Sequence, residues 1–102
     1  CLVTPLRDGM NLVAKEYVLC REDGLVLLSE FAGAAVDLPE AVRVNPFDPE
    51  GVAEAMHHAL SMPAEERRER FSSMKARCAS KDLAWWSRTV LKRLEEAAVA
   101  SV

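Results

Sequence analysis

Two carboxylates near the N-terminus, Asp8 and Glu16, flank a turn and the start of a predicted helix. A carboxylate accepts hydrogen bonds from hydroxyl groups, such as those of a sugar, and repels phosphate. Residues 9–13 would begin the helix, where backbone N–H groups lack intrahelical acceptors and favour anions. Gly9 is free to adopt a positive φ and lets a ligand approach the backbone closely. A phosphate site between two hydroxyl acceptors is the pattern that a nucleotide sugar requires.

The same residues also fit a purely structural interpretation. Asp8 could be an ordinary turn or capping residue, and Glu16 a solvated helix residue without a partner. The turn has neither the G-x-G-x-x-G pattern of dinucleotide-binding loops nor a Walker lysine motif. The residue pattern alone therefore leaves both interpretations open.

Other residue types that could do chemistry favour structural roles. Neighbouring histidines on a helix, such as His57 and His58, point about 100° apart and cannot both ligate one ion well. We therefore predict a surface location for this pair and no metal site.

The cysteines and tryptophans are interpreted in the same way. Cys20 and Cys78 have no catalytic partner nearby in the sequence and are predicted to be small core residues. Trp85 and Trp86 could stack on a sugar, but the amphipathic pattern of their helix favours a core position for Trp86.

Apolar runs and turn residues predict the order strand, helix, strand, strand and three helices. The expected ranges are 1–4, 10–20, 25–28 and 41–45, followed by helices starting at Pro49 and about Pro63 and one over 82–98. Asp48 before Pro49 is a strong helix start. The continuous apolar run at 25–28 is typical of a strand buried on both faces of a parallel sheet. The predicted fold class is α/β, whose ligands bind at the carboxyl edge of the sheet.

Each predicted helix has an apolar face, and the first is expected to be largely buried. The apolar positions are Leu12, Val13, Ala14, Tyr17, Val18 and Leu19 in the first, Val52, Ala55, Met56, Ala59 and Leu60 in the second, Phe71, Met74 and Cys78 in the third, and Leu83, Trp86, Val90 and Leu94 in the fourth. The run EERRER at 65–70, with Glu66 and Arg70 four residues apart, is predicted to be a solvated helix face.

Composition restricts the classes of function. The chain has 102 residues, a net charge of −3 and 50% hydrophobic residues, which is typical of one small globular domain without a nucleic-acid or anionic-lipid surface. No apolar run reaches the roughly 18 residues of a membrane span. Three widely spaced cysteines favour reduced thiols and a cytoplasmic location. The chain opens inside an apolar run without Met, so we expect a piece of a longer polypeptide.

Three stretches resemble the retaining glycosyltransferases of the trehalose-6-phosphate synthase family. They are LVTPLRDGMNLVAKEYV at 2–18, VLLSEFAGAA at 26–35 and VNPFDPEGVAEAMHHAL at 44–60, and the resemblance extends to about Trp86. It implies a two-domain GT-B fold in which residues 1–80 form a donor-binding segment of the Rossmann-like C-terminal domain. Residues 81–102 would be the C-terminal helix, packing back on the missing N-terminal domain. It also implies glucose transfer from UDP-glucose to glucose 6-phosphate with retention, without a metal or other cofactor.

The resemblance also implies a role for each residue of the first motif. Asp8 matches the aspartate that contacts the donor glucose hydroxyls, and it is the catalytic candidate. The remaining matches are Gly9, Met10 and Asn11 to the backbone lining the sugar, Leu12 and Val13 to amides near the diphosphate, and Glu16 to the acid that holds the ribose diol. In the second motif, Glu30 is interpreted as shaping the donor pocket and not as a nucleophile.

Several parts that the family uses are not in this sequence. These are the N-terminal domain, the acceptor site, and the Arg and Lys that neutralise the leaving diphosphate, which Arg7 and Lys15 do not match. Two alternatives therefore stay open: a synthase-like module without transfer activity, and a sister transferase with another acceptor such as glycerol 3-phosphate. The expected partners are a nucleotide sugar, the missing domain and, in the parent enzyme, further copies of itself.

Overall fold

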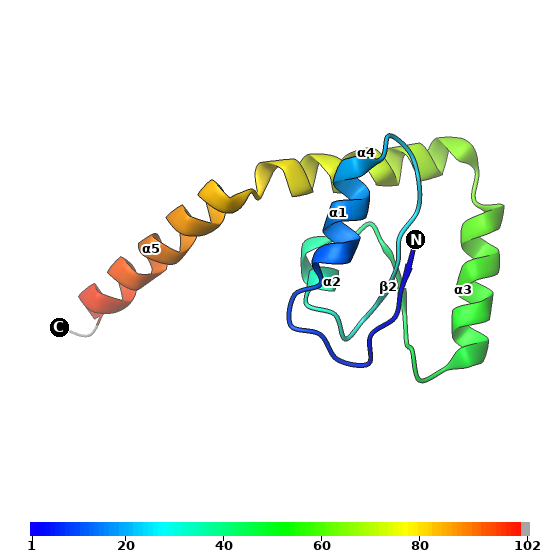
Figure 1. Ribbon diagram of the computed structural model, residues 1–102, viewed down its shortest axis with the longest axis horizontal. Coiled ribbons are helices and arrows are strands. Elements are labelled where there is room, and N and C mark those ends of the chain that lie inside the picture. The colour runs from blue at the N-terminus through cyan, green and yellow to red at the C-terminus, as the bar shows by residue number, and fades with distance from the viewer. Residues whose placement is uncertain (101–102) are drawn as a thin grey trace.

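A computed structural model, which describes residues 1–100, has a three-stranded parallel sheet between helices (Figure 1). The elements are β1 (Leu2–Val3), α1 (Leu12–Cys20), β2 (Leu27–Ser29), α2 (Ala34–Asp37), β3 (Val42–Val44), α3 (Pro49–Ser61), α4 (Ala64–Ser80) and α5 (Leu83–Ala100). The strands lie in the order β1-β2-β3, with Leu2 opposite Leu27 and Leu27 opposite Val42. The predicted α/β class, the parallel sheet and the predicted order of elements along the chain are confirmed. The short helix α2 was not predicted.

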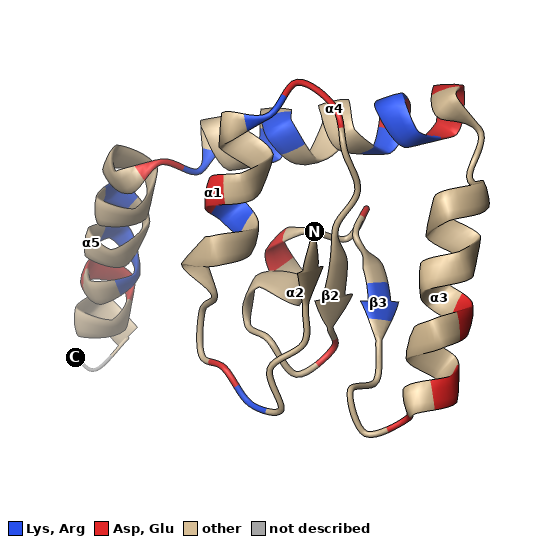
Figure 2. Ribbon diagram, turned by 45° about the vertical axis from the view of Figure 1, so that its right-hand side comes forward, with Lys and Arg blue, Asp and Glu red and all other residues tan. Residues whose placement is uncertain are grey.

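The strand β2 is buried on both faces, as its apolar run predicts. Successive side chains of a strand point to opposite faces. Leu28 accordingly packs with residues of α1, α2 and α4, such as Ala14 and Phe71. Leu27 packs on the other side with Ala59 of α3. Figure 2 shows this arrangement, with α1 and α2 on one side of the strands and α3 on the other.

The helix α1 is less buried than predicted. Ala14 and Val18 are fully buried against the sheet and α4, whereas Leu12, Val13 and Leu19 are about half exposed. The reason is geometric, because a helix of nine residues presents only one stripe to a sheet. Within residues 1–100, its opposite face lies open to solvent.

The helix α3 begins where the sequence predicts. The Asp48 carboxylate accepts a hydrogen bond from the backbone N–H of Gly51 at 3.1 Å, and Pro49 occupies the first helical position. Its apolar face is only partly covered. Ala59 is buried, but Leu60 is 86% exposed.

The helix α4 holds the other elements together through Phe71 and Met74, which are buried as predicted. The prediction that its arginines form a solvated face is only partly correct. Arg70 does pair with Glu66 at 3.3 Å, as the spacing predicts. Arg67, however, donates two nitrogens to the carboxylate of Asp23, at 2.8 Å from its Nη2. Sequence spacing gives no indication that residues 44 positions apart are in contact, so this ion pair was not predicted.

The helix α5 buries none of its residues 83–100, in contrast to the core position predicted for Trp86. Trp86 is 56% exposed, so it does not occupy a core position within the described residues. The helix extends away from the sheet (Figure 1). The radius of gyration is accordingly 16.1 Å, against about 13 Å for a compact domain of this length. The expected C-terminal segment ends at residues 101 and 102, which lie outside the described residues.

The three cysteines are free thiols. Cys78 packs against the core, and burial raises the pKa of its thiol. Cys20 is exposed at the end of α1, so its predicted core position is wrong. Within residues 1–100, no helix combines the length and apolar composition needed to cross a membrane.

Candidate functional site

The loops that follow the three strands lie together at the carboxyl edge of the sheet (Figure 2). The loop after β1 contains Asp8, which forms an isolated parallel bridge with Ala32 in the loop after β2. The loop after β3 joins them through Phe47, whose ring lies edge-on to Phe31 with 5.7 Å between centroids. Parallel strands thus bring the first and second sequence motifs into direct contact.

The carboxylate of Asp8 is held by its own loop. Its Oδ1 accepts a hydrogen bond from the backbone N–H of Met10 at 3.3 Å, and its Oδ2 accepts one from the side-chain amide of Asn11 at 3.0 Å. A carboxylate has about four lone-pair sites, so each oxygen of Asp8 keeps acceptor capacity for a further donor. The group is therefore oriented and still able to bind hydroxyls.

Asn11, and not Gly9, has the left-handed backbone conformation in this loop. Asn11 has a φ of 70°, whereas no glycine has a positive φ, so the expected role of Gly9 in the turn is not observed. Asn11 is one of the few non-glycine residues that tolerate this region. Its Oδ1 accepts a hydrogen bond from Ala14 N–H at 3.0 Å, which caps α1, while its amide nitrogen holds Asp8.

The start of α1 leaves backbone donors available next to Asp8. Leu12 and Val13 are its first two helical residues, so their N–H groups precede the first intrahelical hydrogen bond. The N–H of Met10 is already used by Asp8. Of the amides predicted to face a phosphate, those of Leu12 and Val13 are therefore better placed than that of Met10.

Glu16 lies one turn further along α1 and is exposed. It lines an open cavity of about 300 Å³ between α1, α2 and the α4–α5 junction, together with Lys15, Cys78 and other residues. Asp8 does not line this cavity. Asp8 therefore lies in the loop before α1 and Glu16 on α1, and the two residues do not line the same pocket. Four residues from Leu12 to Glu16 correspond to about 6 Å along the helix axis.

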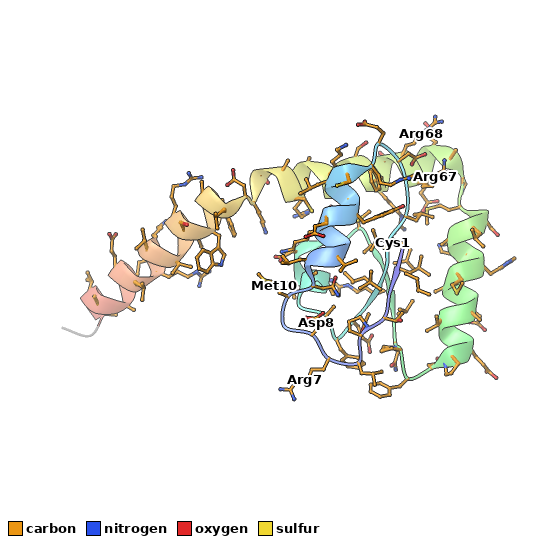
Figure 3. All side chains as sticks on the ribbon, in the orientation of Figure 1. Cys1, Arg7, Asp8, Met10, Arg67 and Arg68 are labelled. Carbon is orange, nitrogen blue, oxygen red and sulfur yellow. The ribbon has the colours of Figure 1, made fainter. Side chains whose placement is uncertain are left out.

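Arg7 and Lys15, the two cations of the first motif, are not positioned to bind an anion at the start of α1. The ammonium group of Lys15 pairs with Asp37 of α2 at 2.8 Å. Arg7 is exposed and points away from the body of the molecule (Figure 3). The positive character at this helix start therefore comes from backbone dipoles.

The remaining candidate residues lie apart from this site or at its margin. His57 and His58 are exposed on α3, as predicted. Glu30 is exposed at the same edge of the sheet as Asp8, and its backbone N–H bonds to Val44 O at 3.0 Å. Within residues 1–100, no three His, Cys, Asp or Glu side chains converge as metal ligands.

Two residues next to the site were missed by sequence reasoning. The N–H of Gly33 donates to the carbonyl oxygen of Asp8 at 2.9 Å. Ser29 is fully buried at the end of β2, and its hydroxyl accepts a hydrogen bond from Phe31 N–H at 3.1 Å. The sequence signal for them was a small residue at each end of the loop after β2. Such a pattern by itself indicates only a tight turn.

Comparisons with known proteins identify the family. The model of "Glycosyltransferase family 20" matches residues 1–96. Over 98 residues, the chain is 53% identical to a trehalose-6-phosphate synthase of Mycobacterium leprae, covering 94% of this chain and 20% of that protein.

Solved structures agree in sequence and in fold. An alpha,alpha-trehalose-phosphate synthase (UDP-forming) from Burkholderia vietnamiensis is 50% identical, with a TM-score of 0.83 over 99% of this chain and 23% of that one. A Burkholderia xenovorans synthase in complex with glucose-6-phosphate is 46% identical, with a TM-score of 0.84 over 92% of this chain and 21% of that one. The chain spans about a fifth of the length of these relatives. It belongs to glycosyltransferase family 20.

Proposed function

We propose that this chain is the donor-binding segment of a retaining glucosyltransferase that makes trehalose 6-phosphate from UDP-glucose and glucose 6-phosphate. One observation carries the proposal: the Asp8 carboxylate is oriented by Met10 and Asn11 directly beside the unpaired amides at the start of α1. Hydroxyl acceptor and anion site are adjacent, as glucose and diphosphate are in the donor. Relatives that bear the synthase name support the same function.

In this proposal each group acts on one part of the donor. Asp8 accepts hydrogen bonds from the glucose hydroxyls, with the Gly9–Asn11 backbone along the sugar. The N–H groups of Leu12 and Val13 and the dipole of α1 bind the diphosphate. Glu16 accepts hydrogen bonds from the ribose diol.

Retaining transfer breaks the bond between the anomeric carbon and UDP and forms a bond to the acceptor oxygen on the same face. The leaving UDP must be stabilised by donors and positive charge as this happens. Lys15 is engaged with Asp37, so this segment contributes amides and a helix dipole. The acceptor site and further cations belong, in the proposal, to another part of the protein. The exposed helix α5 packs against that part, and the whole enzyme needs no metal.

The test uses the full-length protein that contains this chain. Isothermal titration should detect binding of UDP-glucose. Incubation of UDP-glucose with glucose 6-phosphate, in buffer containing a chelator, should yield trehalose 6-phosphate by mass spectrometry. Product with glycerol 3-phosphate but not with glucose 6-phosphate would instead identify a sister transferase. Donor binding without any product would indicate a non-catalytic module, and absence of donor binding would refute the proposal.

A further inference from the structure

The loop that holds Asp8 is supported by the loop after β2. The N–H of Asp8 donates to the carbonyl oxygen of Phe31 at 3.3 Å, and the N–H of Gly33 donates to the carbonyl oxygen of Asp8 at 2.9 Å. These bonds flank the bridge between Asp8 and Ala32 and continue the parallel pairing beyond β1 and β2. The position of Asp8 therefore depends on residues 31–33.

Residues 31–33 are themselves firmly placed. Ser29 is fully buried and bonds the Phe31 N–H through its hydroxyl, while its carbonyl oxygen accepts from Ala32 N–H at 3.1 Å. Ala32 and Ala34 are buried in the core beside Gly33. The loop containing Gly9 and Met10, in contrast, is exposed. The loop after β2 is thus the fixed partner, and the Asp8 loop rests on it.

Gly33 makes the closest approach between the two loops. Its φ of −58° is open to any residue, so its backbone conformation does not require glycine. The requirement is steric: a Cβ atom at position 33 would overlap the carbonyl oxygen of Gly9 and lie 3.2 Å from the Met10 nitrogen. These are backbone atoms, which cannot rotate away as a side chain can. A methyl group at this position must displace the Gly9–Met10 peptide.

The other three glycines do not have such a neighbour. A Cβ at Gly24 would meet the hydroxyl end of the Tyr17 side chain, and one at Gly51 the carboxylate of Asp48. A Cβ at Gly9 would meet no atom within 4 Å. Of the four glycines, only Gly33 has backbone atoms of the Asp8 loop in the space that a Cβ atom would occupy.

We propose that Gly33 is a positioning residue for donor transfer. It sets the Gly9–Met10 peptide, whose N–H holds the Oδ1 of Asp8, and through that hydrogen bond it sets the carboxylate. This inference rests on the proposed function, in which Asp8 contacts the donor glucose. Groups that bind the UDP moiety lie on α1, which is anchored independently by Ala14 and Val18. Displacement of the loop should therefore affect the glucose moiety more than the UDP moiety.

The main experiment compares Gly33→Ala with Gly24→Ala in the full-length protein. For Gly33→Ala we expect kcat to fall by about 10- to 100-fold, as an atomic displacement of about 1 Å at a reacting group does. The dissociation constant for UDP should stay within about threefold of wild type, which is less than 1 kcal/mol. Gly24→Ala, whose new methyl meets a side-chain end, should keep both values near wild type.

A further variant, Gly9→Ala, separates this inference from the proposed function. Its methyl group would meet no protein atom within 4 Å. Because the proposed function places the Gly9 backbone along the donor glucose, the variant should impair transfer without a clash inside the protein. If Gly9→Ala impairs transfer and Gly33→Ala does not, the positioning role is refuted while the proposed function stands. If wild-type protein does not bind UDP-glucose, the proposed function fails, and this inference fails with it. Equal losses of UDP affinity and kcat in Gly33→Ala would show a merely structural role.

Hydrogen exchange provides a measurement that does not depend on folding of the variant. In wild-type protein, the amides of Asp8 and Gly33 should exchange more slowly with UDP-glucose bound than with UDP bound, because glucose holds the loop in place. The amide of Ala14 should be equally protected by both ligands. Equal protection of the Asp8 and Gly33 amides by UDP and UDP-glucose would overturn the proposal.

Discussion

Asp8 and Glu16 have the same chemistry but different settings. The Asp8 carboxylate receives two hydrogen bonds from its own loop and is partly buried. Glu16 is exposed on α1. A group oriented in advance can favour the transition state without further reorganisation, whereas an exposed group that orders on binding contributes mainly to affinity. The two residues should therefore differ in their kinetic effects.

We predict that Glu16→Gln in the full-length enzyme raises the KM for UDP-glucose with little change in kcat. Hydrogen bonds to the ribose diol exist in both ground and transition states, so their loss is a loss of uniform binding. Each charge-assisted bond contributes about 1.5–3 kcal/mol, of which the amide oxygen recovers part. The rise in KM should then be about 5- to 30-fold.

The matched change Asp8→Asn should lower kcat itself, because the glucose gains positive charge as the bond to UDP breaks. The amide also removes one of the two oxygens that accept hydrogen bonds from Met10 and Asn11. Steady-state kinetics over a range of donor concentrations separates the two effects. A fall in kcat with unchanged KM for Glu16→Gln, or wild-type kinetics for both variants, would contradict these roles.

At the scale of the elements, α4 fastens the turn between α1 and β2. Arg67 reaches Asp23 with two nitrogens, and Lys75 bonds the carbonyl oxygen of Arg21 at 2.7 Å. The hydrogen bonds from Arg67 lower the pKa of the Asp23 carboxyl below its ordinary value. The ion pair is partly exposed to solvent, so screening by water and salt weakens it.

We predict that this ion pair makes stability depend on pH in the acid range. Because the pKa of Asp23 is lower in the folded state, the contribution is complete above its unfolded pKa of about 3.9 and is lost as pH falls through the folded value. Wild type should be more stable than Arg67→Met at pH 7, and the difference should vanish well below pH 4.

Urea unfolding at a series of pH values measures this difference without adding salt. Arg68→Met is the matched control, because Arg68 is exposed and its charge lowers the pKa of Asp23 less than Arg67 does. Its curve should follow that of wild type. Parallel curves for wild type and Arg67→Met at all pH values would show that the Asp23 pair contributes no pH-dependent stability.

At the scale of the whole molecule, several apolar surfaces within residues 1–100 are left uncovered, including the following two. The first is the β1 side of the sheet, where Leu2 and Leu6 lie near Met56 of α3. The second is α5, where Leu83 and Trp86 are mostly exposed. Contiguous apolar surface of this kind normally marks an interface. The chain spans about a fifth of the length of its relatives. The proposed function has α5 pack against another part of the protein.

We predict that the 102-residue chain alone self-associates and binds a hydrophobic dye. Light scattering and dye fluorescence measure these properties, with the full-length protein as the control that covers the same surfaces. Replacement of Leu83 and Trp86 by Ser should reduce both signals. A monodisperse chain that leaves the dye dark and melts cooperatively would contradict this prediction.

Features that depend on neighbours along the chain could be predicted from the sequence. The apolar run of β2, the Asp48–Pro49 start of α3 and the stripe of Phe71 and Met74 all follow from local propensity and periodicity. The first motif likewise placed Asp8 in a turn and Glu16 on the following helix. The short helix α2 was missed because four residues carry too little periodic signal.

Features that join residues distant in sequence became visible only in the folded structure. The contact of Gly33 with Gly9 and the pairing of Arg67 with Asp23 require the chain to fold first, because each joins segments more than 20 residues apart. The exposure of Trp86 was also hidden, since an apolar helical stripe predicts a covered face but not which surface covers it. The pattern of apolar side chains shows only whether a segment has the periodicity of a helix or a strand. The position of the Asp8 carboxylate is set instead by contacts between the loops after β1 and β2 at the carboxyl edge of the sheet.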